Sequence, residues 1–193
     1  MVTVSRPART RPTQASSAPL ARWGAAAACL GGICYGAAGY LDNPGASGFV
    51  IGVVLPVLDV ATSASFLGGL LGLYFWAGRE SGPLRMIALL VGLVGTVLGL
   101  FDGLDWWEPD WWILLFFALT AVGLDMLFEE ASGVLGVLVL ASGTLGWVSL
   151  LTDPAFSGVA VPMRAVHVVF AALFCLSCVA WGATLFRKAS QRA

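Results

Sequence analysis

One acidic residue lies inside a long apolar stretch of this chain, where a charge is costly. Asp59 is followed three and four residues later by Thr62 and Ser63, which share its helix face and can hydrogen-bond to it. A mid-bilayer carboxylate costs about 2.5–3.5 kcal/mol, and desolvation favours its protonated form. Pro56 can open the backbone nearby, as in the broken helices of transporters. The main interpretation is that Asp59 lies in water and caps a helix that begins at Val60, and a transport or proton site formed by Asp59, Thr62 and Ser63 is the alternative.

Four cysteines lie in the first and last apolar stretches, two in each. Cys175 and Cys178 have the C-x-x-C spacing that occurs in redox and metal sites. Cys29 and Cys34 would meet this pair if the first and last helices touch. Cysteine also packs as a small apolar side chain, and the pair lies near the middle of its stretch. Packing is therefore the main interpretation, and a membrane thiol oxidoreductase that uses Cys175 and Cys178 is the alternative.

The single histidine, His167, follows Arg164 by three residues near the outer end of the last apolar stretch. It is eleven residues from Cys178, about 16 Å along a helix, so the two cannot share a metal. One histidine cannot make a zinc site without further ligands. His167 is interpreted as an interfacial residue, with a pH-sensing role as the alternative.

Two acidic residues four positions apart share a face at the inner end of the fourth apolar stretch. We expect Asp125 and Glu129 to lie at the cytoplasmic surface, where Arg79, Arg85 or Arg187 can pair with them. Surface ion pairs of this kind contribute only about 0–1 kcal/mol. The simplest interpretation is a solvated helix end.

The composition decides which class of protein must position these residues. Hydrophobic residues make up 59% of the 193 residues, 24 more residues are glycine, and charged residues make up 11%. Soluble domains have about 25% charged residues and could not hide so much apolar surface at this size. Disorder is excluded because it requires low hydrophobicity. The net charge of −1 argues against a nucleic-acid partner, which leaves the lipid bilayer.

Apolar stretches separated by turn residues predict an all-α integral membrane protein, a bundle of about six transmembrane helices with short loops. A hydrocarbon core of about 30 Å needs about 20 helical residues. Residues 1–22 form a basic tail that is expected to be disordered, 23–186 the membrane domain, and 187–193 a second basic tail. The expected spans are roughly 23–41, 50–77, 86–104, 111–128, 133–151 and 164–186.

Basic residues are distributed very unevenly over the two sides of such a bundle. Six spans place nine of the ten Lys and Arg residues on the side of both termini and only Arg164 on the other. By the positive-inside rule, both termini are expected in the cytoplasm, with the bundle in the plasma (inner) membrane.

The second stretch is longer than a bilayer requires. Residues 49–77 would form a helix of about 43 Å. Either this helix tilts strongly, or 49–57 is a separate interfacial piece that ends at Pro56.

Small residues four positions apart allow membrane helices to approach closely. We expect them to pack the bundle internally, with a dimer seam along the third span as the alternative. The residues concerned are Gly32, Gly36, Gly68, Gly72, Gly95, Gly99 and Gly103.

Four tryptophans flank a tight turn between the third and fourth spans. Trp106, Trp107, Trp111 and Trp112 are predicted to anchor this turn in the headgroup layer. The alternative is a stacking platform for an extracellular ligand such as a sugar.

Residues 41–48 and 151–158 share Leu, Pro, Ser and Gly at four of eight positions. Shared turn chemistry is the main interpretation and a parallel repeat the alternative.

Together these features predict a non-enzymatic packing or partner-binding membrane module without metal or cofactor. It would act alone, as a homo-oligomer, or with a membrane-protein partner. The alternative is a small-solute or proton-coupled transporter that uses Asp59, Thr62 and Ser63.

Overall fold

The computed structural model describes residues 17–43, 45–77, 82–102, 111–128, 133–158 and 162–192, and these residues form helices joined by short connections. Six of the helical segments are long and apolar enough to cross a membrane. The prediction of an all-α bundle of about six transmembrane helices is confirmed, and the chain is a polytopic membrane protein. In order, the helices are α1 (Ala18–Leu41), the π-helical turn η1 (Val50–Val54), α2 (Leu55–Ala77), α3 (Pro83–Asp102), α4 (Trp111–Phe128), α5 (Gly133–Thr152), α6 (Pro154–Ser157) and α7 (Pro162–Gln191).

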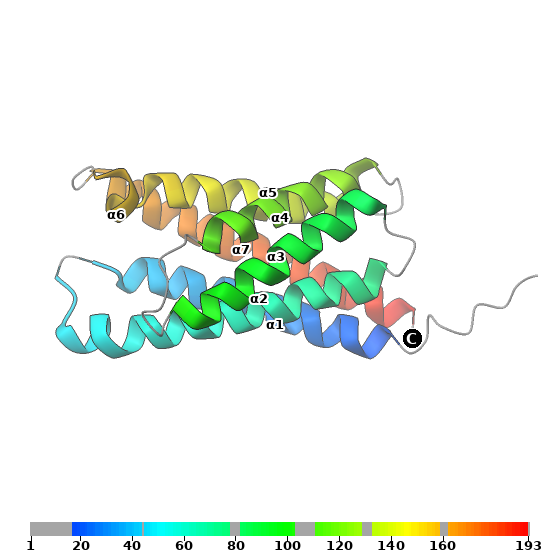
Figure 1. Cartoon of the computed structure of the whole chain (residues 1–193), viewed down its shortest axis with the longest axis horizontal. Coiled ribbons are helices and arrows are strands. Elements are labelled where there is room, and N and C mark those ends of the chain that lie inside the picture. The colour runs from blue at the N-terminus through cyan, green and yellow to red at the C-terminus, as the bar shows by residue number, and fades with distance from the viewer. Residues whose placement is uncertain are drawn as a thin grey trace, which may run out of the picture.

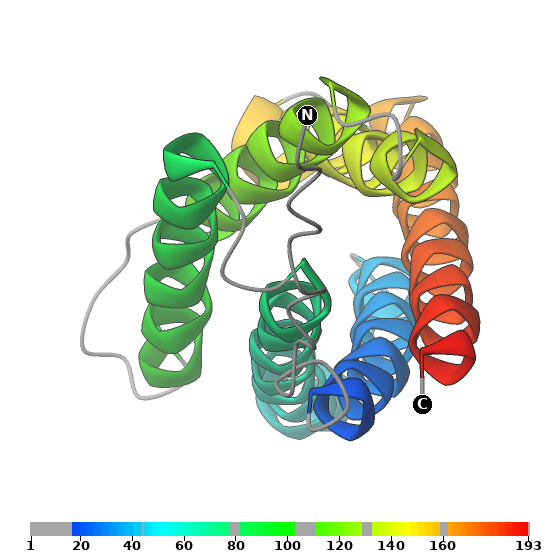
Figure 2. The same cartoon turned by 90° about the vertical axis from the view of Figure 1, so that its right-hand side faces the viewer.

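The six long helices form a closed ring. Each packs against its neighbours in the order α1, α2, α3, α4, α5, α7, and α7 returns to α1 (Figure 2). The start of α1 and the end of α7 lie at the same end of the bundle, here called the termini end (Figure 1). The short helix α6 and the connection from α1 to α2 lie at the opposite end.

The first and last helices extend further than their hydropathy indicated. α1 begins at Ala18 rather than at residue 23, and Pro19 occupies its first turn, where a missing N–H costs nothing. α7 continues through Gln191 instead of stopping at residue 186. Both extensions bury small residues, Ala18 and Ala189, against the bundle. Parts of the two predicted tails are therefore helical.

Pro56 does not divide the second span. A proline inside an α-helix leaves the carbonyl four residues earlier without its bond. The chain accommodates this with a π-helical turn directly before it, in which the Leu55 N–H donates to the Val50 carbonyl. Helix α2 then continues without interruption. The expectation of a separate piece over 49–57 is thus wrong, and Val50–Trp76 is one continuous span.

Glycines bring α1 and α2 into backbone contact. A Cβ added at Gly72 would lie 2.7 Å from the Cα of Gly24, and one added at Gly68 would lie 2.8 Å from the Cβ of Ala27. Such close approach lets helices gain van der Waals contact where no water is present to drive them together.

The glycines of α3 face α4 rather than a second molecule. A Cβ at Gly95 would lie 2.7 Å from the Cβ of Leu114, and one at Gly99 would lie 2.5 Å from the ring of Trp111. The dimer-seam alternative is therefore wrong for Gly95 and Gly99, because α4 already occupies this face. Gly103 lies outside the described residues.

Aromatic rings fill the interior of the ring of helices. Tyr35 packs against Phe174 at 4.6 Å and against Trp112 at 4.9 Å between ring centroids. Phe66 and Phe116 contact the other sides of Phe174, at 5.6 and 5.4 Å. This cluster joins α1, α2, α4 and α7.

Two of the predicted tryptophan anchors lie between helices. Trp111 is 2% exposed, because the missing side chain of Gly99 leaves room for its ring. Trp112 is half-buried against Tyr35. The headgroup-layer prediction therefore does not describe the main contacts of either ring. Trp106 and Trp107 lie outside the described residues.

The two similar segments at the opposite end differ in backbone structure. In the second, Asp153 caps α6, and Gly158 ends it with φ of 64°, in the left-handed region that favours glycine. In the first, the Ala46 N–H donates to the Asn43 carbonyl in a turn that precedes η1.

Candidate functional site

A buried imidazole connects three parts of the chain near the end opposite the termini. His167 lies in the second turn of α7 and is 6% exposed. Its Nδ1 is 2.9 Å from the carbonyl oxygen of Ser149 on α5. A carbonyl can only accept, so Nδ1 carries the proton of this hydrogen bond. The contact fixes both the ring orientation and the tautomer of the neutral imidazole.

The position of Ser149 explains why its carbonyl is available. The last four carbonyls of a helix have no partner within the helix, and Ser149 lies three residues before the end of α5 at Thr152. The Thr152 hydroxyl and the imidazole both donate to this oxygen, at 3.1 and 2.9 Å. The same end of α5 carries partial negative charge, which favours a cation beside it.

The side chain of Ser149 continues the polar contacts to α1. Its hydroxyl is 2.9 Å from the hydroxyl of Tyr35 and 3.4 Å from His167 Nδ1. Tyr35 is buried, and its ring is held by the aromatic cluster. Tyr35, Ser149 and His167, with the carboxylate described next, are called the histidine cluster.

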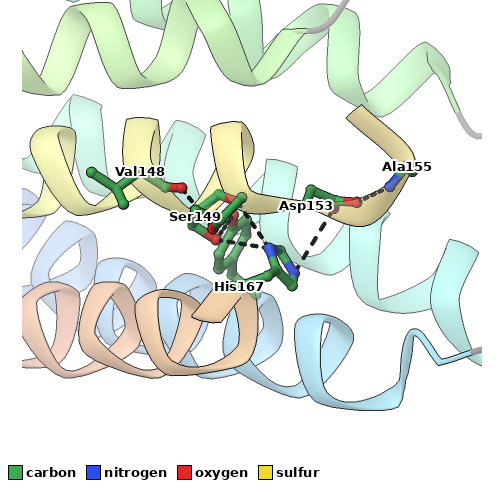
Figure 3. A network of polar contacts seen from close by, with 7 residues as sticks. Val148, Ser149, Asp153, Ala155 and His167 are labelled. Carbon is green, nitrogen blue, oxygen red and sulfur yellow. Dashed lines mark hydrogen bonds and ion pairs between the residues drawn. The ribbon is translucent and has the colours of Figure 1, made fainter. Parts of the chain in front are cut away.

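Asp153 completes the histidine cluster from the connection between α5 and α6. Its Oδ2 is 3.8 Å from His167 Nε2, and its Oδ1 accepts a 2.7 Å hydrogen bond from the Ala155 N–H (Figure 3). Gly39 of α1 also lies close to Nε2, where an added Cβ would be 3.4 Å away. Nε2 is therefore the ring nitrogen that can gain or lose a proton, with a carboxylate beside it.

Two further charged residues lie on the helices that carry or adjoin the histidine cluster. Asp59 of α2 lies near enough to the Tyr35 hydroxyl to act on it electrostatically, as does Asp153. Arg164 lies one turn before His167 on α7 itself.

The predicted group lies on α2, which packs against α1. Asp59 is half-buried and lies inside α2, so it does not cap a helix that begins at Val60, and that interpretation is wrong. The Ser63 hydroxyl donates to the backbone carbonyl of Asp59 at 2.9 Å rather than to its side chain. The Thr62 hydroxyl is fully buried and has no hydrogen-bond partner among the described residues.

The cysteines lie on α1 and α7, which pack together. Cys29, Cys34, Cys175 and Cys178 are all free thiols. Cys178 and Cys175 lie over Gly32 and Gly36 of α1, where an added Cβ would be 2.6 and 3.0 Å from the two cysteine Cβ atoms. The glycines and cysteines thus interlock as small packing groups.

An ion pair joins α3 and α4 at the termini end. Arg85 Nε is 2.7 Å from Asp125 Oδ2, and the arginine is 2% exposed. The predicted partner for Asp125 is therefore present, but the pair is more buried than a solvated helix end. Glu129 lies outside the described residues.

Sequence reasoning missed the partners of His167. Tyr35 and Ser149 are uncharged polar residues within apolar stretches, and Asp153 was assigned only to a turn. A search for polar side chains inside spans would have found the first two, together with Ser142 and Ser177, whose hydroxyls are 2.9 Å apart between α5 and α7. Among the residues that the structure describes, no three His, Cys, Asp or Glu side chains are grouped as metal ligands.

Comparison with protein-family models, curated protein sequences and solved structures finds no match to this chain. The function is therefore argued from the site itself.

Proposed function

We propose that this chain is a non-enzymatic membrane module that responds to proton concentration through the histidine cluster. The observation that carries the proposal is that the two nitrogens of one imidazole have different partners. Nδ1 donates a hydrogen bond to the Ser149 carbonyl, and Nε2 lies 3.8 Å from a carboxylate oxygen of Asp153. Ionisable residues inside membrane segments are rare and costly, and they commonly belong to proton pathways. Histidine is the side chain that ordinarily changes charge between about pH 5 and 8.

The proposed response is mechanical. Protonation at Nε2 turns a weak polar contact into an attraction between imidazolium and carboxylate. Asp153 also caps α6, so this attraction draws the connection between α5 and α6 toward α7. Loss of the proton from Nε2 removes this attraction and releases the connection. A protein partner could detect the two positions of this segment.

The proposed orientation places the histidine cluster near the external surface. Nine of the ten basic residues lie in the tails and connections on the termini side of the expected spans, which favours a cytoplasmic location for that side. The expected location is the plasma (inner) membrane. The histidine cluster would then sense the external proton concentration.

Hydrogen–deuterium exchange of the protein in lipid nanodiscs tests this proposal. After correction for the intrinsic pH dependence of exchange, we expect segment 153–158 to exchange more slowly at pH 5.5 than at pH 7.5. The reason is the tighter attraction of Asp153 to the protonated ring. His167→Gln should abolish this difference, whereas Met163→Gln, one turn earlier on the same helix, should retain it. The same pH difference in His167→Gln would contradict the proposal.

A second candidate function is proton-coupled transport through the α2 side of the cluster. It is favoured by one observation: the fully buried Thr62 hydroxyl has no hydrogen-bond partner among the described residues. Asp59 lies one turn away on α2 and acts electrostatically on Tyr35. Together they offer acceptors for a proton or a small polar solute.

Proteoliposomes with a trapped pH dye separate the two candidates. Transport predicts protein-dependent acidification under an imposed gradient, which is lost in Asp59→Asn. The sensing module predicts no flux above protein-free vesicles. Flux that persists unchanged in Asp59→Asn would rule out the α2 site as its route.

A further inference from the structure

An apolar groove lies between α1 and α7, nearer to the termini end than the histidine cluster. Its volume is about 280 Å³. The lining consists of small residues and one aromatic ring: Ala25, Ala26, Cys29, Gly182, Ala183 and Phe186.

The groove follows from the small side chains on both helices. A Cβ at Gly182 would lie 2.6 Å from the Cys29 sulfur, so the two backbones meet closely at the floor. Ala26 and Ala183 are exposed at the rim and are too short to fill the space beside the larger Phe186. Both helices are membrane spans, so the groove opens toward lipid and its apolar lining suits an acyl chain.

Two arginines lie at the termini end of this groove. Arg22 precedes Ala26 by four residues and Arg187 follows Ala183 by four, so each is one turn nearer to the membrane boundary on the same helix face. The Nε atom of Arg22 is buried and has no hydrogen-bond partner among the described residues. Guanidinium groups bind phosphate with two parallel hydrogen bonds.

Two other arginines at this end have partners within the described part of the chain. Arg85 is paired with Asp125 at 2.7 Å. Arg192 lies over the ring of Trp76 at 4.7 Å and donates to its carbonyl at 3.0 Å. The two arginines beside the groove have no ion pair within the described part of the chain, and they are placed for an anion that comes from outside it.

We propose that the groove binds one anionic phospholipid. One acyl chain lies against Gly182 and Ala183, and the phosphate is held by Arg22 and Arg187. Apolar space and cationic groups follow one another along the groove in the order in which a phospholipid presents its tail and headgroup. The inference does not depend on the histidine cluster or on which side of the membrane the termini occupy.

Native mass spectrometry of the full-length protein in detergent, titrated with dioleoyl phosphatidylglycerol or dioleoyl phosphatidylcholine, tests the proposal. We expect one phosphatidylglycerol to bind in preference to phosphatidylcholine. Arg22→Gln and Arg187→Gln should each weaken this binding about fivefold, as expected for one basic residue near an anionic headgroup. Ala183→Leu should weaken it by filling the groove while both charges remain.

Matched variants separate the groove from general effects. Ala172→Leu adds the same side chain to an exposed position on nearly the same face of α7, and it should leave binding unchanged. Lys188→Gln removes a neighbouring charge that lies toward Trp76, and its effect should be smaller than that of Arg187→Gln. Folding of each variant is checked by its elution and melting temperature. Equal binding of both lipids, or equal losses in Lys188→Gln and Arg187→Gln, would overturn the proposal.

Discussion

His167 illustrates how a membrane interior constrains a single side chain. Burial leaves no water to satisfy a ring nitrogen, so each nitrogen must find its partner within the protein. The carbonyl of Ser149, near the end of α5, accepts a hydrogen bond from Nδ1. The other nitrogen, Nε2, lies 3.8 Å from Oδ2 of Asp153. A second proton would make the ring positively charged, and its attraction to the carboxylate would shorten this distance.

The Tyr35 hydroxyl should contribute far less to stability than the Tyr35 ring. Tyr35→Phe keeps the contacts with Phe174 and Trp112 and loses only the hydrogen bond to Ser149, for an expected cost of about 0.6–1.7 kcal/mol. Tyr35→Ala leaves a cavity and should cost about 3–5 kcal/mol. Unfolding by denaturing detergent in mixed micelles measures both.

The exposed Tyr40 provides the control for this comparison. Its side chain is 70% exposed, so Tyr40→Phe should change the unfolding free energy by less than about 0.5 kcal/mol. Equal losses in Tyr35→Phe and Tyr40→Phe would contradict the assignment of a structural hydrogen bond to Tyr35.

At the residue scale, the sequence identifies costly charges better than it identifies their partners. Asp59 is conspicuous because a charged carboxylate within a membrane span has a high free-energy cost. Tyr35 and Ser149 are 114 residues apart and electrically neutral, and only the packing of α7 against both α1 and α5 brings them to His167. No local pattern carries this information.

At the scale of elements, glycines decide how closely helices approach. Spacing alone identified the small residues of α1, α2 and α3, but it could not say which helix each one faces. For Gly95 and Gly99 the answer is α4, because Leu114 and Trp111 occupy the space above them. Pro56 likewise correctly predicted an irregularity in the second span. The sequence did not distinguish a break in the helix from the π-helical turn that keeps the span continuous.

Gly24→Ala should therefore destabilise the bundle more than Gly52→Ala does. The added methyl group would collide with the backbone of Gly72, which cannot move without separating α1 from α2, and the expected cost is about 1–3 kcal/mol. Gly52→Ala meets nothing within 4 Å and should be neutral or slightly stabilising. Comparison of the two melting temperatures in one detergent checks this, and equal melting temperatures would refute the close contact.

At the scale of the whole molecule, the bilayer made the architecture predictable. Its thickness sets the length of a span, and six stretches of that length exist in the chain. The helix ends were less predictable: α1 and α7 continue beyond their apolar cores because Ala18 and Ala189 still find neighbours to pack against. The closure of the ring by α7 on α1 depends on the match between Gly32, Gly36 and the cysteines of α7, which hydropathy does not report.

The proposed orientation predicts which positions an impermeant maleimide reaches in intact cells. Gly48→Cys lies at the exposed end opposite the termini and should be labelled from outside. Gln191→Cys lies at the termini end and should be labelled only after permeabilisation. Wild-type protein, whose four cysteines all lie within spans, provides the background. The reverse pattern would invert the orientation and place the histidine cluster on the cytoplasmic side.

The most direct test of the proposed proton response is the state of the one imidazole in this chain. With ¹⁵N-labelled histidine, the protein in bilayers gives signals from a single ring, because His167 is the only histidine. We expect the neutral ring to carry its proton on Nδ1 and, as the pH falls, to gain a second proton on Nε2. A neutral ring protonated on Nε2, or a ring that gains no proton between pH 8 and pH 5, would contradict the account.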